Sequence, residues 1–425
     1  MPLKVCNVSI SCLCSTAKQI VTLRFPSKQT TTGQLDINFC HCYACRHSSG
    51  LLCVSYAPIQ PPQSTNGIVT YLDETANVRR YFCGTCGCHI FKREQGSSRD
   101  AVGADGLWAV ATGTIIGRAG TEEGADWDPE VADGGKGYSI LKFAGHVNVA
   151  GTKDGGLSPF IQNISEPREP EICGHHNEVP PPPSVSVPGE GKNAGRSDED
   201  VLEAHCHCET VRFRITRPDA SSRVPHSGFP DLTVPFATSP PELISNPDDE
   251  KWWLRPPDSP NPTMYLAGLC ACRSCRLTSG FEAQTWTFVP RSNIFFLPPS
   301  HSSSPHAAIE NTLIPLDFSA LPKGILQSYE SSPGVLREFC PRCGATVFWH
   351  DRWRPGIVDV STGLLDAPEG ARAESWLDWW YSRVSFAEDA GNGRVGEAAQ
   401  WAENVVDSFS KGLKLWEENG GKGVA

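Results

Sequence analysis

Two stretches of the chain show the apolar and polar patterns that are typical of β-strands. Residues 204–215 alternate with period two, and residues 20–25 form a β-branched run; both patterns indicate half-buried strands. Each strand follows a Cys-x-Cys motif, which is Cys12 and Cys14 in the first case and Cys206 and Cys208 in the second. The same local pattern therefore occurs in two distant parts of the chain.

A second pair of segments aligns without a gap. Residues 78–91 and 335–348 each contain a strand pattern, a Cys-x-x-Cys knuckle and another strand pattern. This order is typical of a zinc ribbon, in which a tight turn between two strands presents the thiols. The two alignments predict a mainly β chain in which one zinc-bound domain is repeated in tandem.

The C-terminal segment has a different period. Trp401, Val405, Phe409 and Leu413 recur at helical spacing. The spacing predicts an amphipathic helix over about 394–419. We expect its apolar face to pack on the second domain, and a dimer contact is the alternative.

The length of 425 residues fits two domains with a linker between them. We assign the first domain to residues 1–164, a Pro- and Gly-rich linker to 165–200, and the second domain to 201–425. Between the Cys-x-Cys motif and the next cysteines, the first domain has 25 residues and the second has 61. The extra length, about 218–262, is expected to be a solvated surface excursion, and a lid over the site is the alternative.

Charge and composition restrict the classes of function. The formal net charge of -11 disfavours sequence-independent binding to nucleic acid. The start of the chain has no signal-peptide core, and no apolar run is long enough to span a bilayer. The sequence therefore predicts no membrane partner and a cytoplasmic protein, with the nucleus as the alternative. In a reducing compartment, closely spaced cysteines are more often metal ligands or redox groups than disulfides.

Cysteine carries the candidate chemistry. Seven cysteines in the order two, three, two occur twice, and this pattern takes up 14 of the 18 cysteines. The outer pairs of each repeat supply the four thiolates of a closed structural zinc site. These four-cysteine groups are Cys12, Cys14, Cys83 and Cys86 in the first domain and Cys206, Cys208, Cys340 and Cys343 in the second.

The three central cysteines of each repeat form a compact cluster. The first cluster is Cys40, Cys42 and Cys45, and the second cluster is Cys270, Cys272 and Cys275. Three protein ligands with an open position are the arrangement of a catalytic zinc. Possible fourth ligands near the first cluster are not shared by the second copy; the facing pairs are His41 and Ala271, His47 and Leu277, Cys53 and Ala283, and Cys88 and Ala345. This favours an open site and predicts two zinc ions per domain, four per chain; a closed site or another pairing of the cysteines is the alternative.

A zinc ion held by three thiolates keeps little Lewis acidity, because the thiolates donate charge to it. Its natural fourth ligand is another thiolate. Zinc deprotonates a coordinating thiol, which makes that sulfur available to add to a carbonyl carbon or to leave from one. The clusters therefore predict the making or breaking of a carbon–sulfur bond, and no metalloprotease, Walker or nucleophile-elbow motif competes with them.

At these residues the chain resembles the family of glutathione-dependent formaldehyde-activating enzymes and the related centromere protein V. The resemblance covers roughly 8–160 and 200–390 and is carried by the three cysteine motifs of each copy, the third being Phe82-Cys83-x-x-Cys86-Gly87 in the first. It implies a β-tent fold with one structural and one catalytic zinc per domain. It also implies lyase chemistry on a glutathione–aldehyde adduct, S-hydroxymethylglutathione in the named activity.

Arg46 and Arg276 occupy the same register just beyond each cluster. A guanidinium there could pair with a carboxylate of glutathione, so both arginines are predicted to bind substrate. The alternative is that each arginine donates hydrogen bonds to backbone carbonyls of its own knuckle.

One competing class of function is compatible with the same residues. Zinc-stabilised β-domains can be non-catalytic binding or scaffold modules for a protein or chromatin partner. A redox-active thiol protein is disfavoured, because each Cys-x-x-Cys comes with partners that fill a zinc shell. The oligomeric state is left open by the sequence.

Overall fold

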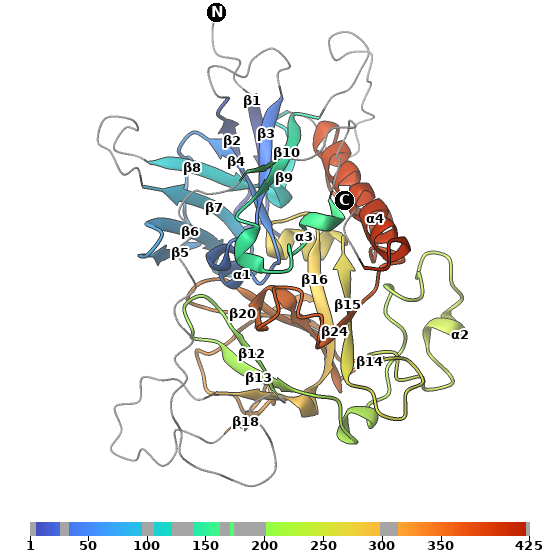
Figure 1. Ribbon diagram of the computed structural model, residues 1–425. Coiled ribbons are helices and arrows are strands. Elements are labelled where there is room, and N and C mark those ends of the chain that lie inside the picture. Colours follow the sequence, from blue (N-terminus) through green and yellow to red (C-terminus); the bar gives the residue numbers. More distant parts are fainter. Residues whose placement is uncertain are drawn as a thin grey trace, which may run out of the picture.

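The computed structural model describes residues 6–25, 34–95, 106–120, 139–161, 201–297 and 313–421, and the backbone of 171–173. It confirms a mainly β protein with few helices, the longest of them at the C-terminal end (Figure 1). We call the chain up to residue 173 the first half and the chain from residue 201 the second half. Within the described residues, no helix has the length and apolarity needed to cross a membrane.

The first half is built on one sheet of 11 strands. Its main path runs β11-β10-β3-β4-β8-β7-β6-β5, and β1, β2 and β9 join it from the side. Burial alternates along β3, so one of its faces meets the core. The strands are β1 (Cys6–Ile10), β2 (Gln19–Leu23), β3 (Leu35–Cys40), β4 (Val54–Ile59), β5 (Ile68–Asp73), β6 (Val78–Cys83), β7 (His89–Glu94), β8 (Leu107–Ala111), β9 (Ile115–Arg118), β10 (Leu141–Val147) and β11 (Glu171–Cys173).

The second half contains a five-stranded sheet, β18-β17-β13-β12-β23, and an eight-stranded sheet, β14-β15-β16-β22-β21-β20-β19 with β24 beside β15. Strand β16 is buried along its whole length and forms the centre of this half. The strands are β12 (Val201–His205), β13 (Arg212–Thr216), β14 (Leu254–Arg255), β15 (Met264–Cys270), β16 (Gln284–Pro290), β17 (Ile294–Phe296), β18 (Ile314–Pro315), β19 (Gln327–Ser332), β20 (Val335–Phe339), β21 (Thr346–Asp351), β22 (Ile357–Ser361), β23 (Leu365–Asp366) and β24 (Leu377–Trp379).

Matching elements follow one another in the same order in both halves. The β6–β7 and β20–β21 hairpins carry the predicted knuckles, and their registers shift at equivalent places, Tyr81/Phe82 and Glu338/Phe339. Strand β10 pairs parallel with β3, as β24 pairs parallel with β15. A bulge is a specific local distortion, so its recurrence supports the alignment of the two segments.

A short helix follows each three-cysteine cluster, α1 (Tyr43–Ser49) in the first half and α3 (Arg273–Ser279) in the second. The sequence did not predict these helices. In each of them the N-cap residue is the middle cysteine of the cluster, and the helix ends at a left-handed glycine, Gly50 or Gly280, with φ of 82° and 84°. Glycine is favoured there because a Cβ is strained at positive φ.

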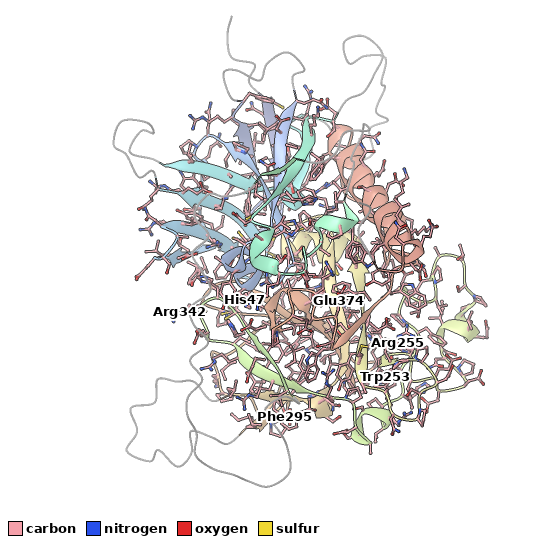
Figure 2. All side chains as sticks on the ribbon, in the orientation of Figure 1. His47, Trp253, Arg255, Phe295, Arg342 and Glu374 are labelled. Carbon is pink, nitrogen blue, oxygen red and sulfur yellow. The ribbon has the colours of Figure 1, made fainter. Side chains whose placement is uncertain are left out.

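The two halves interlock through two sets of matching backbone contacts. The amide of Gly113 donates to the carbonyl of Gly280 at 2.9 Å, and the amide of Gly363 donates to the carbonyl of Gly50 at 3.1 Å. A Cβ on Gly113 would lie 2.5 Å from the carbonyl carbon of Gly280. The amide of His207 donates to the carbonyl of His47, which Figure 2 labels near the boundary between the halves, at 2.9 Å. The halves therefore form one packed unit.

Gly280→Ala is expected to destabilise the fold by about 2–5 kcal/mol. The positive φ costs an L-residue roughly 1–2 kcal/mol, and overpacking adds about 1–3 kcal/mol because the new Cβ would meet the carbonyl oxygen of His89 in the other half. Gly324→Ala is the matched control, since Gly324 has a φ of 88° but nothing within 4 Å of its Cβ position. Denaturant unfolding measures the free energy of unfolding of both variants. Equal losses of stability would show that the contact between the two halves tolerates a methyl group.

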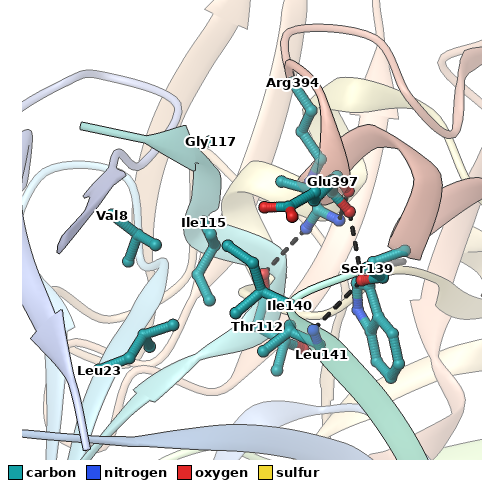
Figure 3. A pocket seen from close by; sticks show the side chains of 12 residues that line it. Val8, Leu23, Thr112, Ile115, Gly117, Ser139, Ile140, Leu141, Arg394 and Glu397 are labelled. Atoms are coloured by element: carbon teal, nitrogen blue, oxygen red, sulfur yellow. Dashed lines mark hydrogen bonds between the residues drawn. The ribbon is translucent and has the colours of Figure 1, made fainter. Parts of the chain in front are cut away.

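The C-terminal helix α4 (Glu397–Glu418) forms as predicted, and it contacts both halves of the chain, but mainly the first half and not the second half that was expected. It packs on β9, β10 and the 3₁₀ helix Ser158–Phe160 of the first half (Figure 1). The backbone of Phe160 lies so close to Gly412 that no side chain would fit there. Figure 3 shows the start of α4 on this surface, where the backbone carbonyl of Glu397 accepts a hydrogen bond from Ser139 Oγ at 3.2 Å. The helix thus holds the second half of the chain against the first.

Most residues of the insertion over about 218–262 are exposed or partly exposed, as expected of a solvated excursion, but a few side chains anchor it on the rest of the second half. Trp253 (Figure 2) is fully buried and donates from Nε1 to the carbonyl of Ser222 at 3.0 Å. Trp252 is also buried, and β14 pairs with β15. Two buried indoles remove a large apolar area from water, so the insertion is anchored to the core of the second half, where Trp252 packs on Phe288 of β16.

The predicted linker lies mostly outside the described residues. Its residues 171–173 form β11, which pairs parallel with β10.

Candidate functional site

Four cysteine side chains meet at the base of each hairpin. In both four-cysteine groups all Sγ atoms lie within 4.8 Å of one another. Cys14 Sγ is 3.5 Å from Cys12 Sγ and 3.4 Å from Cys83 Sγ, and in the second half Cys208 Sγ is 3.5 Å from Cys340 Sγ. A tetrahedral zinc with Zn–S bonds of about 2.3 Å separates its sulfurs by roughly 3.8 Å. The spacing fits one such ion in each group.

The donor set also favours a cation. All described cysteines are free thiols. Burial and the neighbouring sulfurs of Cys206 and Cys208 raise the pKa of the Cys343 thiol well above its usual range. Negative charge on all four sulfurs therefore requires a positive ion between them, and zinc prefers this closed set of four thiolates.

Each three-cysteine cluster lies where a strand ends and a helix begins. In the second half, Cys270 ends β15, Cys272 caps α3 and Cys275 lies in its first turn. The first cluster has the same arrangement on β3 and α1. The three Sγ atoms of each cluster lie within 4.8 Å of one another, and no fourth His, Cys, Asp or Glu of the described residues joins them. Each cluster can supply three ligands to a metal ion.

One sulfur in each cluster is favoured as a thiolate. Hydrogen bonds from the Cys40 and Cys42 thiols, together with the charge of Arg80, hold the pKa of Cys45 well below its ordinary value. In the second cluster, hydrogen bonds from Cys270 and Cys275 lower the pKa of Cys272 in the same way, with a further contribution from Arg337. Both clusters are therefore suited to bind a cation.

An arginine beside each cluster was missed by the sequence interpretation. Arg337 Nη1 and Nη2 each lie 3.6 Å from Cys275 Sγ, and Arg80 Nη2 lies 3.7 Å from Cys45 Sγ. Both arginines are buried. The gapless alignment of residues 78–91 with 335–348 places Arg80 opposite Arg337, and this shared position is the signal that could have identified them.

The surroundings of the two clusters differ. Next to the first cluster, Asp73 Oδ2 accepts from Arg80 Nη1 at 3.0 Å and lies 3.6 Å from Nε2 of His207, a residue of the second half. Leu13 of the first half stands at the position of the Cys-x-Cys motif that His207 occupies in the second half, and Leu13 lines the pocket at the second cluster. Each cluster is thus flanked by the Cys-x-Cys turn of the other half.

The second cluster opens into a pocket of about 690 Å³. This volume lies in the range of roughly 300–1,000 Å³ that is typical of small-molecule sites. All three cysteines of the second cluster line it, together with Trp286 and Trp349 of the sheet. Charged side chains also line the pocket, namely Arg273, Arg337, Arg354, Asp231, Asp351 and Asp359.

The insertion forms one wall of this pocket. Phe229, Leu232, Phe236 and Ile244 come from it and line the cavity. The insertion therefore borders the site, and its role as a lid stays a prediction.

Asp359 is the carboxylate in the pocket with a shifted acidity. Burial raises its pKa to about 6, although Arg354 opposes the shift from 2.6 Å. This carboxyl group can exchange a proton near neutral pH.

Residues 7–121 match the family model of the glutathione-dependent formaldehyde-activating enzyme. The matched segment contains the first four-cysteine group, the first cluster and Arg80. No curated protein and no solved structure matches the chain. The first half is thus similar to the formaldehyde-activating enzymes, and the second half presents the same cysteine spacing and the same elements beyond the matched segment.

The predicted substrate-binding role of Arg276 is corrected by its contacts. Arg276 is fully buried, and its Nη1 and Nη2 donate to the carbonyls of Gly113 and Asn392, both at 2.7 Å. It ties down backbone carbonyls, as the alternative proposed, although these carbonyls belong to the other half and to the segment before α4. Arg46 is also buried, and its Nε and Nη1 have no partner in the described part of the chain. Its role toward a carboxylate stays a prediction.

Proposed function

We propose that this protein is a zinc-dependent carbon–sulfur lyase that acts on a glutathione–aldehyde adduct such as S-hydroxymethylglutathione. We also propose that it is a tandem pair of formaldehyde-activating-enzyme-like domains, related to centromere protein V, with two zinc ions in each and four per chain. The observation that carries the proposal is the second cluster, three cysteines that open together into a pocket of about 690 Å³. The match of residues 7–121 to the family supports it.

In the proposed reaction the carbon–sulfur bond of the adduct breaks and the aldehyde is released. The bonding electron pair goes to sulfur, the hydroxyl proton leaves the oxygen as the C=O bond forms, and the sulfur takes up a proton to give glutathione. Zinc, when bound by the cluster, supplies the positive charge that stabilises a thiolate leaving group.

The residues of the pocket have separate tasks in this proposal. Asp359 accepts the hydroxyl proton, because its pKa of about 6 suits a general base near neutral pH. Arg337, 3.6 Å from Cys275 Sγ, contributes to the lowered pKa of Cys272 and so favours negative charge on the second cluster. Arg273 and Arg354 line the pocket and pair with the carboxylates of glutathione. Arg273 and Arg354 thus take the carboxylate-binding role that was expected of Arg276.

The proposed chemistry needs reduced cysteines and a supply of glutathione. We therefore place the protein in the cytoplasm, with the nucleus as the alternative, since both compartments keep thiols reduced.

Full-length protein is expected to contain four zinc ions and to release formaldehyde from S-hydroxymethylglutathione. Cys272→Ser should lose one zinc and only the turnover of the second cluster, whereas Cys272→Ser combined with Cys42→Ser should lower total turnover more than about 100-fold, since the loss of a supporting residue around a metal alone costs roughly 10–100-fold. Cys42→Ser, the equivalent change in the first cluster, is the matched comparison. Metal analysis and a formaldehyde-release assay measure both quantities.

Two outcomes would contradict this proposal. Two zinc ions per chain would mean that the clusters are empty or that the cysteines share one site. Failure to bind glutathione adducts at millimolar concentration, together with stable binding of a purified protein partner, would favour the scaffold class.

A further inference from the structure

Several aromatic side chains line the pocket around the second cluster. From the sheet, Trp286 and Phe288 of β16 and Trp349 of β21 line it. Trp286 and Phe288 are only 3% and 5% exposed, so their positions are set by the core. Rigid aromatic side chains offer a large apolar area and favour contact with another ring.

The insertion adds aromatic residues to the same pocket. Phe236 is 42% exposed and packs edge-on against Phe386 at 5.7 Å between ring centroids. Its amide donates to Asp231 Oδ2 at 2.8 Å, which holds the backbone at the pocket. Phe229 lines the same wall. Exposed aromatic side chains at a cavity leave apolar surface in water, which a bound apolar group would cover.

The aromatic wall is a property of the second half. At the positions that align with Trp286, Phe288 and Trp349, the first half carries Tyr56, Pro58 and Lys92. Lys92 Nζ pairs with Glu94 at 2.7 Å, so a charge stands where the second half has an indole. The segment between the Cys-x-Cys motif and the next cysteines is also shorter in the first half, 25 residues against 61.

Cations border the same apolar wall. The guanidinium of Arg354 lies 4.6 Å from the ring centroid of Trp349, and Arg273 lines the cavity beside the cluster. A ligand that matches this surface has an anionic part and a bulky apolar part, with sulfur placed toward the three cysteines. The hydroxymethyl group of a formaldehyde adduct supplies no such apolar part.

We propose that the second cluster acts on a thiol adduct that carries a bulky aromatic group, and that the insertion is the element that selects it. This inference rests on the proposed lyase function and gives the substrate class of one of its two sites. The second half then differs from the first in substrate, although both share the same arrangement of cysteines.

The test uses the full-length zinc-loaded protein and two unreactive thioethers, S-benzylglutathione and S-methylglutathione. Isothermal titration calorimetry should show at least tenfold tighter binding of the benzyl compound, because a single methylene in an apolar pocket already discriminates by roughly 10–200-fold. Phe236→Ala and Trp349→Lys should each reduce that preference at least threefold. Leu243→Ala is the matched control, since Leu243 is an exposed apolar residue of the same insertion that does not line the pocket.

The outcomes separate this inference from the lyase proposal. Equal binding of both thioethers would overturn the aromatic substrate class and leave the lyase function standing. A benzyl preference that survives both pocket variants would place the binding elsewhere and would also overturn the inference. Binding of neither thioether would remove the glutathione ligand itself, and with it the proposed function.

Discussion

Cys340→Ser is expected to unfold the second half of the protein. Cys340 is one of the four sulfurs through which the proposed zinc would join the Cys-x-Cys turn after β12 to the β20–β21 hairpin. A structural zinc contributes about 10–16 kcal/mol in small zinc domains, which is comparable with the ~5–15 kcal/mol net stability of a folded domain. Loss of one ligand in this closed site therefore removes more stability than the second half can spare.

Cys272→Ser changes the other kind of cysteine and should leave the fold intact. The second cluster joins residues that are already neighbours at the end of β15 and the start of α3, so its metal closes only a short loop. A metal that closes only a short loop restricts the unfolded chain slightly, so losing this metal should change the free energy of unfolding little. The expected result is a protein that unfolds cooperatively with one zinc fewer.

Thermal unfolding and zinc content of the full-length variants distinguish the two cases. The full chain is needed because α4, which ends the second half, packs on the first half. If Cys272→Ser unfolded the protein as severely as Cys340→Ser, the second cluster would be structural and the lyase proposal would lose its main physical support.

Glu282→Ala is expected to destabilise the protein by about 3–5 kcal/mol, because it leaves a buried arginine without its carboxylate. Glu282 Oε1 accepts from Arg394 Nη2 at 3.2 Å, and both side chains are 0% exposed. The same carboxylate accepts from Thr112 Oγ1 and from Trp401 Nε1, both at 2.9 Å. One side chain thus joins the first half, the second half and α4, so its loss should weaken all three contacts together.

A surface pair provides the control for this prediction. Glu203 Oε1 accepts from Arg214 Nε at 2.6 Å, and these side chains are 40% and 36% exposed. Glu203→Ala should therefore cost only about 0–1 kcal/mol. Denaturant unfolding compares the two variants, and equal losses would mean that water already reaches Glu282.

The sequence alone was sufficient to group the cysteines correctly. The Cys-x-Cys and Cys-x-x-Cys motifs are short, so each presents its sulfurs together in any fold, and the strand patterns on either side of Cys83 and Cys340 placed the knuckles in hairpins. The structure brings together the four groups that the spacing predicted. The period of residues 401–413 likewise predicted α4, because helical spacing is a property of the local chain.

The surface that covers α4 was decided by the tertiary structure. An apolar stripe shows which face of a helix is buried but carries no information about the surface that buries it. Proximity along the chain favoured the second half, whereas the contacts of Glu397 and Gly412 lie on the first.

The roles of the arginines and of the insertion also required the fold. A guanidinium can serve a carbonyl, a thiolate or a ligand, and the sequence is the same in each case. The packing of the halves directs Arg276 to the carbonyl of Gly113, and the pairing of strands within the second half directs Arg337 to the sulfur of Cys275. In the same way, residues 218–262 have a composition typical of a loop, and it is the burial of Trp253 that holds them at the pocket. Local spacing determined the cysteine groups, and long-range packing determined what surrounds them, because each neighbour there comes from a distant part of the chain.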